Sequence, residues 1–135
     1  MTVVTAVNGC PYCAWFHSRL AVSSGIGREE IANMLRLQFG ADAPDDEIMG
    51  LLYAQHHAES EGRPDQEMTR YLFDRYGEEA ARDISLVIRV ITFGNLLGNT
   101  VDAFLSRLRG RGARDGDALF ESLLFMIASP FILPA

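Results

Sequence analysis

The sequence contains little of what several common classes of protein require. Two cysteines among 135 residues are too few to hold together a secreted disulfide scaffold. Twelve Lys and Arg residues against 18 Asp and Glu leave a net charge of −6, which cannot neutralise a nucleic-acid backbone. No charge-free run reaches the roughly 20 apolar residues that span a bilayer. The first residues also lack the basic and apolar regions of a signal peptide. We therefore expect a soluble, cytoplasmic protein that binds neither nucleic acid nor membrane.

What the sequence does contain is the composition of one globular domain. Apolar residues make up 48% of the chain and charged residues 22%, which is enough to bury a core. Apolar positions recur with a period near 3.6, which predicts helices. The expected helices are Cys10–Val22, Arg28–Phe39, Asp46–Ser60, Gln66–Tyr76, Glu78–Arg109 and Gly116–Ala128. The sequence thus predicts a single all-α domain over residues 1–135, with the Glu78–Arg109 helix at its centre.

Two parts of this pattern bear on packing. Residues 2–7 are short and β-branched, and they fit either a strand or the last turns of a helix. Between Ile84 and Leu97 the central helix is apolar nearly all round, and such a helix must be buried. Gly94 and Gly98 lie four residues apart in it, so another backbone can approach closely there.

The chemistry concentrates in residues 8–17, Asn-Gly-Cys-Pro-Tyr-Cys-Ala-Trp-Phe-His. The leading Asn-Gly pair is a turn signal, and Pro11 suits the first position of a helix. Cys10 then lies at a helix N-terminus, where the dipole and free N–H groups stabilise a thiolate. Cys13 and His17 follow on the same helix face. The two thiols can therefore close a disulfide, and the imidazole can take a proton from Cys13.

Two other interpretations of this segment stay open. The cysteines could be small buried apolar residues without chemistry. Alternatively, Cys10, Cys13 and His17 could bind zinc, with His56 or His57 as a fourth ligand. The redox interpretation accounts for the cysteine spacing, the helix start and the histidine together, and we favour it.

The same segment resembles two families. Cys-Pro-Tyr-Cys is similar to the glutaredoxin active site, but the glutaredoxin fold needs further strands and the chain after Cys13 looks helical. The longer pattern, Cys-x-x-Cys followed by His17, resembles the AhpD-like family of the alkylhydroperoxidase and carboxymuconolactone decarboxylase superfamily. Residues 18–30 and 91–104 are similar to later parts of that family. The resemblance implies an AhpD-like helical domain with a long buried central helix, usually assembled as a homo-oligomer.

The resemblance also implies roles for the site residues. Cys13 would attack the peroxide, Cys10 would be the resolving thiol, and His17 would belong to the proton relay. Cys10, nearer the open helix end, would meet the external reductant. The family's relay has a glutamate upstream of the first cysteine for which the printed sequence has no counterpart, and Tyr12 stands where some relatives carry a relay histidine.

Replacements for the missing relay groups are sought on the Asp46–Ser60 helix. Its predicted apolar face consists of Ile48, Leu51 and Leu52. Helical spacing extends this face to Gln55, His56 and Glu59, which are possible relay residues or supports of the relay. His57 points away from that face and is expected in solvent. A polar stripe on the central helix is expected to form hydrogen bonds between helices: Asn95, Asn99 and Asp102.

Apolar residues crowd the C-terminal segment. They are Phe120, Leu123, Leu124, Met126, Ile127, Phe131, Ile132 and Leu133. So much apolar surface at a chain end must pack on the domain or meet another subunit. The segment lacks the basic polar face of a membrane-surface helix. This gives a second reason, independent of the resemblance, to expect a homo-oligomer.

Together these observations predict a thiol-dependent peroxidase of the antioxidant type, or a disulfide oxidoreductase. Peroxide would oxidise Cys13 to a sulfenic acid, Cys10 would condense with it, and an external dithiol would reduce the resulting disulfide. Neither an organic cofactor nor a metal is expected. The alternatives are a non-catalytic redox-sensing or binding module of the same fold, or a carboxymuconolactone decarboxylase-like enzyme.

Overall fold

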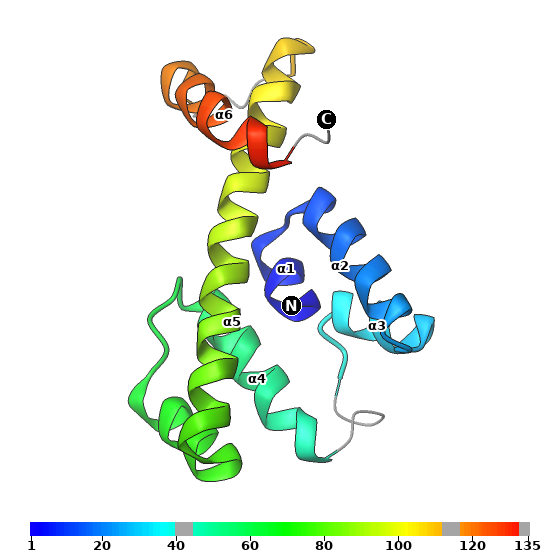
Figure 1. Cartoon of the computed structure of the whole chain (residues 1–135), viewed down its shortest axis with the longest axis vertical. Coiled ribbons are helices and arrows are strands. Elements are labelled where there is room, and N and C mark those ends of the chain that lie inside the picture. Colours follow the sequence, from blue (N-terminus) through cyan, green and yellow to red (C-terminus); the bar gives the residue numbers. More distant parts are fainter. Residues whose placement is uncertain (40–44, 112–116, 133–135) are drawn as a thin grey trace.

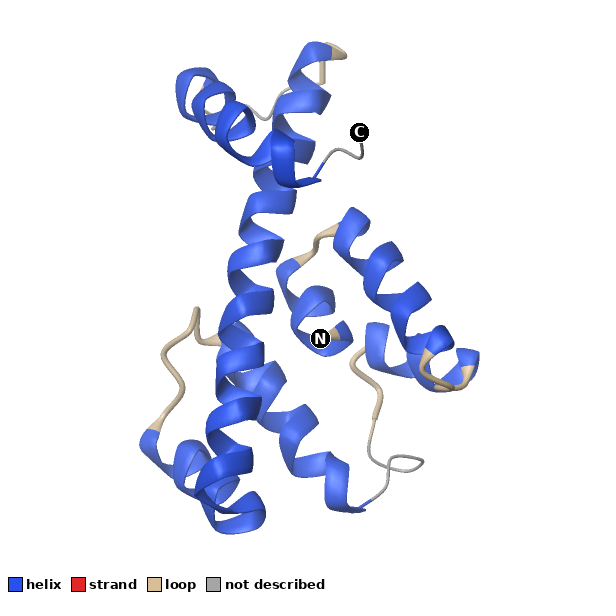
Figure 2. Cartoon of the chain, viewed as in Figure 1, coloured by secondary structure: helices blue, strands red, loops and turns tan. Residues whose placement is uncertain are grey.

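The computed structural model describes residues 1–39, 45–111 and 117–132, and every regular element in these ranges is a helix. The helices are α1 (Thr2–Asn8), α2 (Pro11–Ser23), α3 (Arg28–Leu35), α4 (Asp45–Glu59), α5 (Gln66–Leu108) and α6 (Ala118–Ile132). The predicted all-α class with a long central helix is confirmed. In Figures 1 and 2, α5 runs the length of the molecule, with α1 to α4 beside one part of it and α6 at its far end.

The segment that fitted either a strand or a helix is helix α1, and it lies at the centre of the fold. It packs against α2, α3, α4 and α5. Val3 and Val4 are 1% and 0% exposed, and Thr5 is equally buried. Packing on several sides therefore overrides the β-branched composition of this helix, as tertiary context commonly does. Gly9, with φ 62°, ends it in the left-handed conformation that glycine adopts without cost.

The predicted break at Gly77 is present as a kink inside α5. Gly77 has φ 76° and ψ 171°, far from helical values, and it joins the segments on either side. Asp65 caps the start of α5, since its carboxylate accepts a hydrogen bond from the Met68 N–H at 2.7 Å. The single element α5 therefore consists of two helical segments joined at Gly77, which agrees with the separately predicted helices Gln66–Tyr76 and Glu78–Arg109.

Several predicted helix ends differ from the structure. Helix α3 ends at Leu35 rather than Phe39, because Leu37 adopts a positive φ of 57° that interrupts the helix. Helix α6 continues to Ile132, past the expected stop before Pro130; its predicted start at Gly116 and the apolar Leu133 lie outside the described residues. A proline this close to a helix end interrupts little of the hydrogen-bond ladder.

The core lies where α1, α3, α4 and the first two-thirds of α5 meet. Its buried members are Val3, Val4, Met34, Tyr53, Ala54, Ala58, Leu72, Ala81 and Ile88. The expectation that α5 is buried all round between Ile84 and Leu97 is wrong for the single chain. Five large apolar side chains there are 46–63% exposed: Leu86, Val87, Val90, Phe93 and Leu96. The other helices cover one side of α5 and leave the opposite side open.

This exposed side gives α5 an ambiguous character. By length and composition alone, α5 could cross a membrane, and the core helix of a soluble protein would pass the same test. Only 22% of the most apolar 18-residue stretch of α5 is buried inside the structure. The apolar side of α5 therefore lacks a cover among the residues that the structure describes.

Helix α6 packs on α5 alone among the helices described. The rings of Phe104 and Phe125 stack with centroids 4.5 Å apart, and Arg107 Nε donates to Glu121 Oε2 at 2.7 Å. The hydrogen bond from Arg107 lowers the pKa of Glu121, so this pair stays ionised. The far side of α6 is apolar and open, with Leu119 78% exposed.

Candidate redox site

The site lies at the connection between α1 and α2. Gly9 turns the chain, Cys10 is the N-cap of α2, and Pro11 occupies the first helical position, as the sequence predicts. Cys10 and Cys13 form a disulfide, with their Cα atoms 5.3 Å apart. Cys10 Sγ also accepts from the Cys13 N–H at 3.3 Å, so this sulfur serves as the helix cap. One turn of helix thus places both sulfurs side by side.

The disulfide lies directly against α5 at Gly98. A Cβ atom on Gly98 would be 2.8 Å from the sulfurs of both Cys10 and Cys13, closer than real Cβ contacts come. A Cβ on Gly94 would meet nothing within 4 Å. Of the two glycines that indicated a close approach, Gly98 is the one that makes room for the redox pair. Asn99 holds the same junction, because its Nδ2 donates to the Asn8 carbonyl at 2.8 Å.

A cavity of about 240 Å³ opens between α2 and α5 beside the disulfide. Its lining residues are Tyr12, Cys13, Phe16, His17, Val90, Ile91, Gly94, Asn95 and Gly98. Cys13 lines this cavity, whereas Cys10 does not and is only 1% exposed. The expectation that Cys10 meets the external reductant is therefore wrong for this geometry, because the helix N-terminus is packed against α5 rather than open.

His17 lies one helical turn after Cys13 and lines the same cavity. Its Nδ1 is buried and has no hydrogen-bond partner within the described part of the chain. Burial lowers the pKa of His17, so the imidazole is neutral at pH 7. A neutral imidazole with a free ring nitrogen can accept a proton, which is the property a base for the Cys13 thiol needs.

Asn95 is a site residue that sequence reasoning assigned only to packing. The predicted hydrogen bond between helices is present, since Thr5 Oγ1 donates to Asn95 Oδ1 at 3.2 Å. Asn95 is 1% exposed, and its Nδ2 has no acceptor among the described residues although it lines the cavity. A buried, unpaired donor beside a reactive sulfur can bind an oxygen atom of a substrate. Its one-turn spacing from Gly98 was the available signal.

The other two residues of the predicted polar stripe on α5, Asn99 and Asp102, behave differently. Asn99 forms its interhelical hydrogen bond to Asn8, whereas Asp102 is exposed and makes no hydrogen bond or ion pair to any described residue. The expectation is confirmed for Asn95 and Asn99 and is wrong for Asp102, which is turned outward on α5.

The three candidate relay residues of α4 are not brought to the disulfide. No Cα of α4 lies within 8 Å of a Cα of α2, which carries Cys13. His56 Nε2 instead lies 3.0 Å from Asp65 Oδ2, and Gln55 Nε2 donates to Glu59 Oε1 at 2.7 Å. These side chains hold the end of α4 and its connection to α5.

The prediction that His57 is exposed to solvent is wrong. It is only 2% exposed, and neither ring nitrogen has a partner within the described ranges. The buried face of α4 carries Tyr53, Ala54, His57 and Ala58, whereas Leu52, expected on that face, is 43% exposed. The helix is rotated from the predicted orientation: Tyr53, Ala54 and Ala58 lie in the core, Leu51 packs partly buried against it, and Leu52 faces outward.

The described residues do not form the zinc site that was the alternative interpretation of this segment. Cys10 and Cys13 are bonded to each other, and His56 and His57 belong to α4 and its environment. No group of three His, Cys, Asp or Glu side chains among the described residues is arranged to hold a metal ion.

Comparisons with known proteins found no relative of this chain. No family model, no curated protein and no solved structure matches the chain. The chemistry of the site therefore rests on its own geometry.

Proposed function

We propose that the chain is a thiol-dependent peroxidase or disulfide oxidoreductase of the AhpD-like type. The observation that carries this proposal is the Cys10–Cys13 disulfide, of which one sulfur, that of Cys13, faces a cavity shared with the His17 imidazole. The resemblance of residues 8–17 to the AhpD-like motif supports the same assignment.

The oxidative half begins from the dithiol. His17 takes the proton of Cys13, and the thiolate attacks the terminal oxygen of a hydroperoxide, breaking the O–O bond. Cys13 becomes a sulfenic acid, and the departing alkoxide or hydroxide takes the proton held by His17. The unpaired Asn95 amide is placed to donate to an oxygen in this cavity. The Cys10 thiol then attacks the Cys13 sulfur, forms the disulfide and releases water.

The reductive half needs an external dithiol. Its thiolate attacks the Cys13 sulfur, because Cys13 lines the cavity while Cys10 is buried against Gly98. Cys10 leaves as a thiolate and is protonated, and the second thiol of the donor resolves the mixed disulfide. Two electrons pass from the donor to the chain in each cycle, and no organic cofactor takes part in either half. A reducing cytoplasm would supply such a donor.

A redox-sensing module is the second candidate, and the size of the cavity favours it. About 240 Å³ falls below the ~300–1,000 Å³ that is usual for small-molecule sites. A sensor needs only a small oxidant and no bound organic substrate. It would carry out the same oxidation without rapid turnover.

Counting free thiols before and after one equivalent of peroxide tests the proposal. Wild type should lose both thiols of each chain and gain an intramolecular disulfide, and Cys10→Ser should stop at a sulfenic acid on Cys13. Catalytic consumption of peroxide with a dithiol donor distinguishes the enzyme from the sensor. If Cys13→Ser reacts with peroxide as fast as wild type, the assigned roles are wrong.

We also propose that the chain assembles as a homo-oligomer. The exposed apolar side of α5, from Leu86 to Leu96, and the open face of α6 have no cover within the described residues. A second copy of the chain would supply one, and closed homo-oligomers are the commonest solution.

A further inference from the structure

A second and larger cavity lies on the other face of α2. It measures about 850 Å³, within the range of small-molecule sites. It is bounded by α2 and α3, and the residues that line it include Trp15, Ser18, Arg19 and Ser23 of α2 and Arg28 and Leu35 of α3. None of them lines the disulfide cavity. The positions on α2 alternate between the two cavities with helical spacing, so α2 separates them.

The walls of this cavity are mainly apolar and carry two positively charged side chains. Alanine, valine, isoleucine and leucine side chains and the Trp15 ring supply the apolar part. Arg19 and Arg28 supply two guanidinium groups, and no Asp or Glu is among the lining residues, although the chain carries a net charge of −6. Two of the twelve basic residues of this acidic protein therefore line one concave surface, and no carboxylate is among its lining residues.

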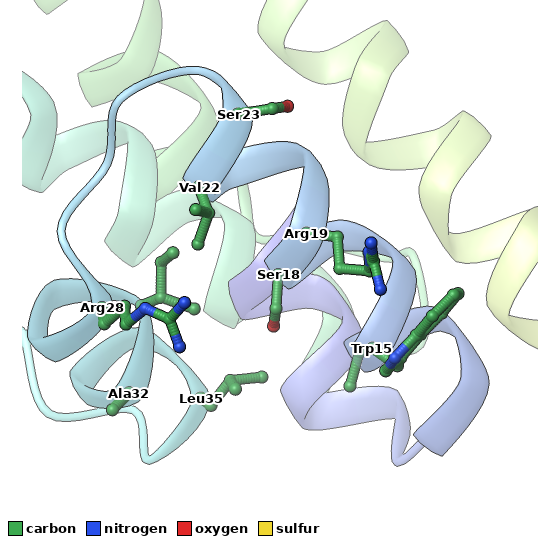
Figure 3. Close-up of a pocket in the computed structure, with 10 residues that line it drawn as sticks. Trp15, Ser18, Arg19, Val22, Ser23, Arg28, Ala32 and Leu35 are labelled. Atoms are coloured by element: carbon green, nitrogen blue, oxygen red, sulfur yellow. The ribbon is translucent and has the colours of Figure 1, made fainter.

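Two polar side chains of the cavity, Arg28 and Ser18, have no partner among the described residues and can bind a ligand. Arg28 forms no ion pair with any residue that the structure describes, and Arg19 only stacks over the Trp15 ring at 5.1 Å. The Ser18 hydroxyl likewise has no hydrogen bond within the described ranges, whereas that of Ser23 is used by the Leu20 carbonyl at 2.7 Å. In Figure 3, Ser18, Arg28 and Leu35 face the space between the two helices, and Arg19 lies beside Trp15.

We infer that this cavity binds an aliphatic carboxylate, a small amphipathic anion with an apolar chain. The apolar walls would remove the chain from water. The carboxylate would accept hydrogen bonds from Arg28 and Ser18, and a guanidinium can hold both of its oxygens. The site is separate from the disulfide chemistry and does not depend on it.

The chain contains one tryptophan, Trp15, and it lines this cavity, so its fluorescence reports a ligand bound there. The full-length chain is titrated with decanoate, below the concentration at which decanoate forms micelles. Decanol and decyltrimethylammonium carry the same chain with no charge and with the opposite charge. Decanoate should give a saturable change in Trp15 fluorescence, with an affinity at least tenfold above that for either control.

Arg28→Gln and Arg36→Gln form a matched pair of variants. Both residues are exposed arginines at opposite ends of α3, and Arg36 does not line the cavity. Arg28→Gln should weaken decanoate binding about tenfold or more, since hydrogen bonds to charged groups are of that strength. Arg36→Gln should leave it unchanged. Circular dichroism confirms that each variant keeps its helical content.

Three results would overturn the inference. The first is no saturable response to decanoate. The second is equal affinity for decanoate, decanol and decyltrimethylammonium, which would leave only an apolar groove. The third is Trp15 fluorescence that changes with protein concentration in the absence of ligand and blocks the decanoate response, which would assign the groove to a second copy of the chain.

Discussion

Gly98 sets how closely the redox pair can lie against the central helix. A methyl group at this position would come within 2.8 Å of both sulfurs, so the disulfide or α5 must move. We expect Gly98→Ala to destabilise the oxidised protein by about 1–3 kcal/mol, the usual cost of overpacking. Urea unfolding of the oxidised chain measures it.

Gly94→Ala is the matched control for this substitution. It lies one turn away on α5, where a Cβ meets nothing within 4 Å. Alanine favours a helix interior over glycine, so this variant should gain roughly 0.5–1 kcal/mol. Equal effects of the two substitutions would show that the sulfur contact with Gly98 has no energetic importance.

His17 should control the ionisation of Cys13. Because burial lowers the pKa of His17, the imidazole is neutral at pH 7 and available as a base. We expect His17→Ala to slow thiol oxidation more at pH 7 than at pH 9, where the thiol ionises without help. Stopped-flow peroxide kinetics at both pH values measures this. His56→Ala, which alters a histidine paired with Asp65, should change neither rate; equal slowing by His17→Ala at both pH values would exclude the relay role.

His57 should make the fold sensitive to acid. Burial, and then the charges of Arg89 and His56, lower the pKa of His57 below its ordinary value of 6.5. The folded state therefore binds fewer protons than the unfolded state below pH 6.5, and stability falls as the pH drops. The loss from one such group is at most about 1.4 kcal/mol per pH unit.

Urea unfolding between pH 7.5 and pH 5 tests the acid sensitivity of His57. His57→Gln cannot take up this proton, so its stability should vary less with pH than that of wild type. His17 contributes a slope of the same sign, because burial lowers its pKa too, so the variant should keep part of the dependence. An unchanged slope in His57→Gln would show that the buried imidazole is not the titrating group.

At the scale of the element, Gly77 decides the course of α5. Its φ of 76° is accessible to glycine and strained for other residues, and a Cβ there would meet nothing within 4 Å. The cost of Gly77→Ala is therefore one of backbone conformation alone. We expect a loss of about 1–3 kcal/mol, measured by urea unfolding. A gain in stability, as expected for Gly94→Ala, would mean that α5 runs through Gly77 without a kink in solution.

At the scale of the whole molecule, the open apolar faces decide the assembly. Each large apolar side chain on α5 and α6 contributes roughly 1.5–3 kcal/mol when it becomes fully buried. We expect the intact chain to run as a dimer or larger oligomer at micromolar concentration in light scattering. A monomer of 15.0 kDa would contradict this. Partition into lipid vesicles would point to the membrane-like composition of α5 instead.

A shortened chain locates the interface. Ending the chain at Gly116 removes α6 and its open apolar face. If α6 forms the interface, the shortened chain should run as a monomer. If the assembly survives, the side of α5 from Leu86 to Leu96 carries it, and Phe93→Glu should then dissociate it, since Phe93 is 63% exposed in the single chain.

The sequence by itself determined the local features of this protein. The helical class, the cap at Asp65, the kink at Gly77 and the place of Cys10 at the start of α2 all follow from residues a few positions apart. Cys10 and Cys13 could be paired in advance for the same reason, because one helical turn brings them together. Helix period, capping and turn chemistry act over such short distances along the chain, so they can be predicted without knowing the tertiary structure.

Only the tertiary structure decided which faces meet. It buried His57 and left Leu52 exposed, since α4 presents its alanines to the core. It set Gly98 rather than Gly94 against the sulfurs, brought Asn95 to the cavity, and kept Gln55, His56 and Glu59 away from it. It also left one side of an apolar helix open. Each outcome depends on the rotation of one helix against a neighbour distant in sequence, and helical periodicity carries no information about which neighbour that is.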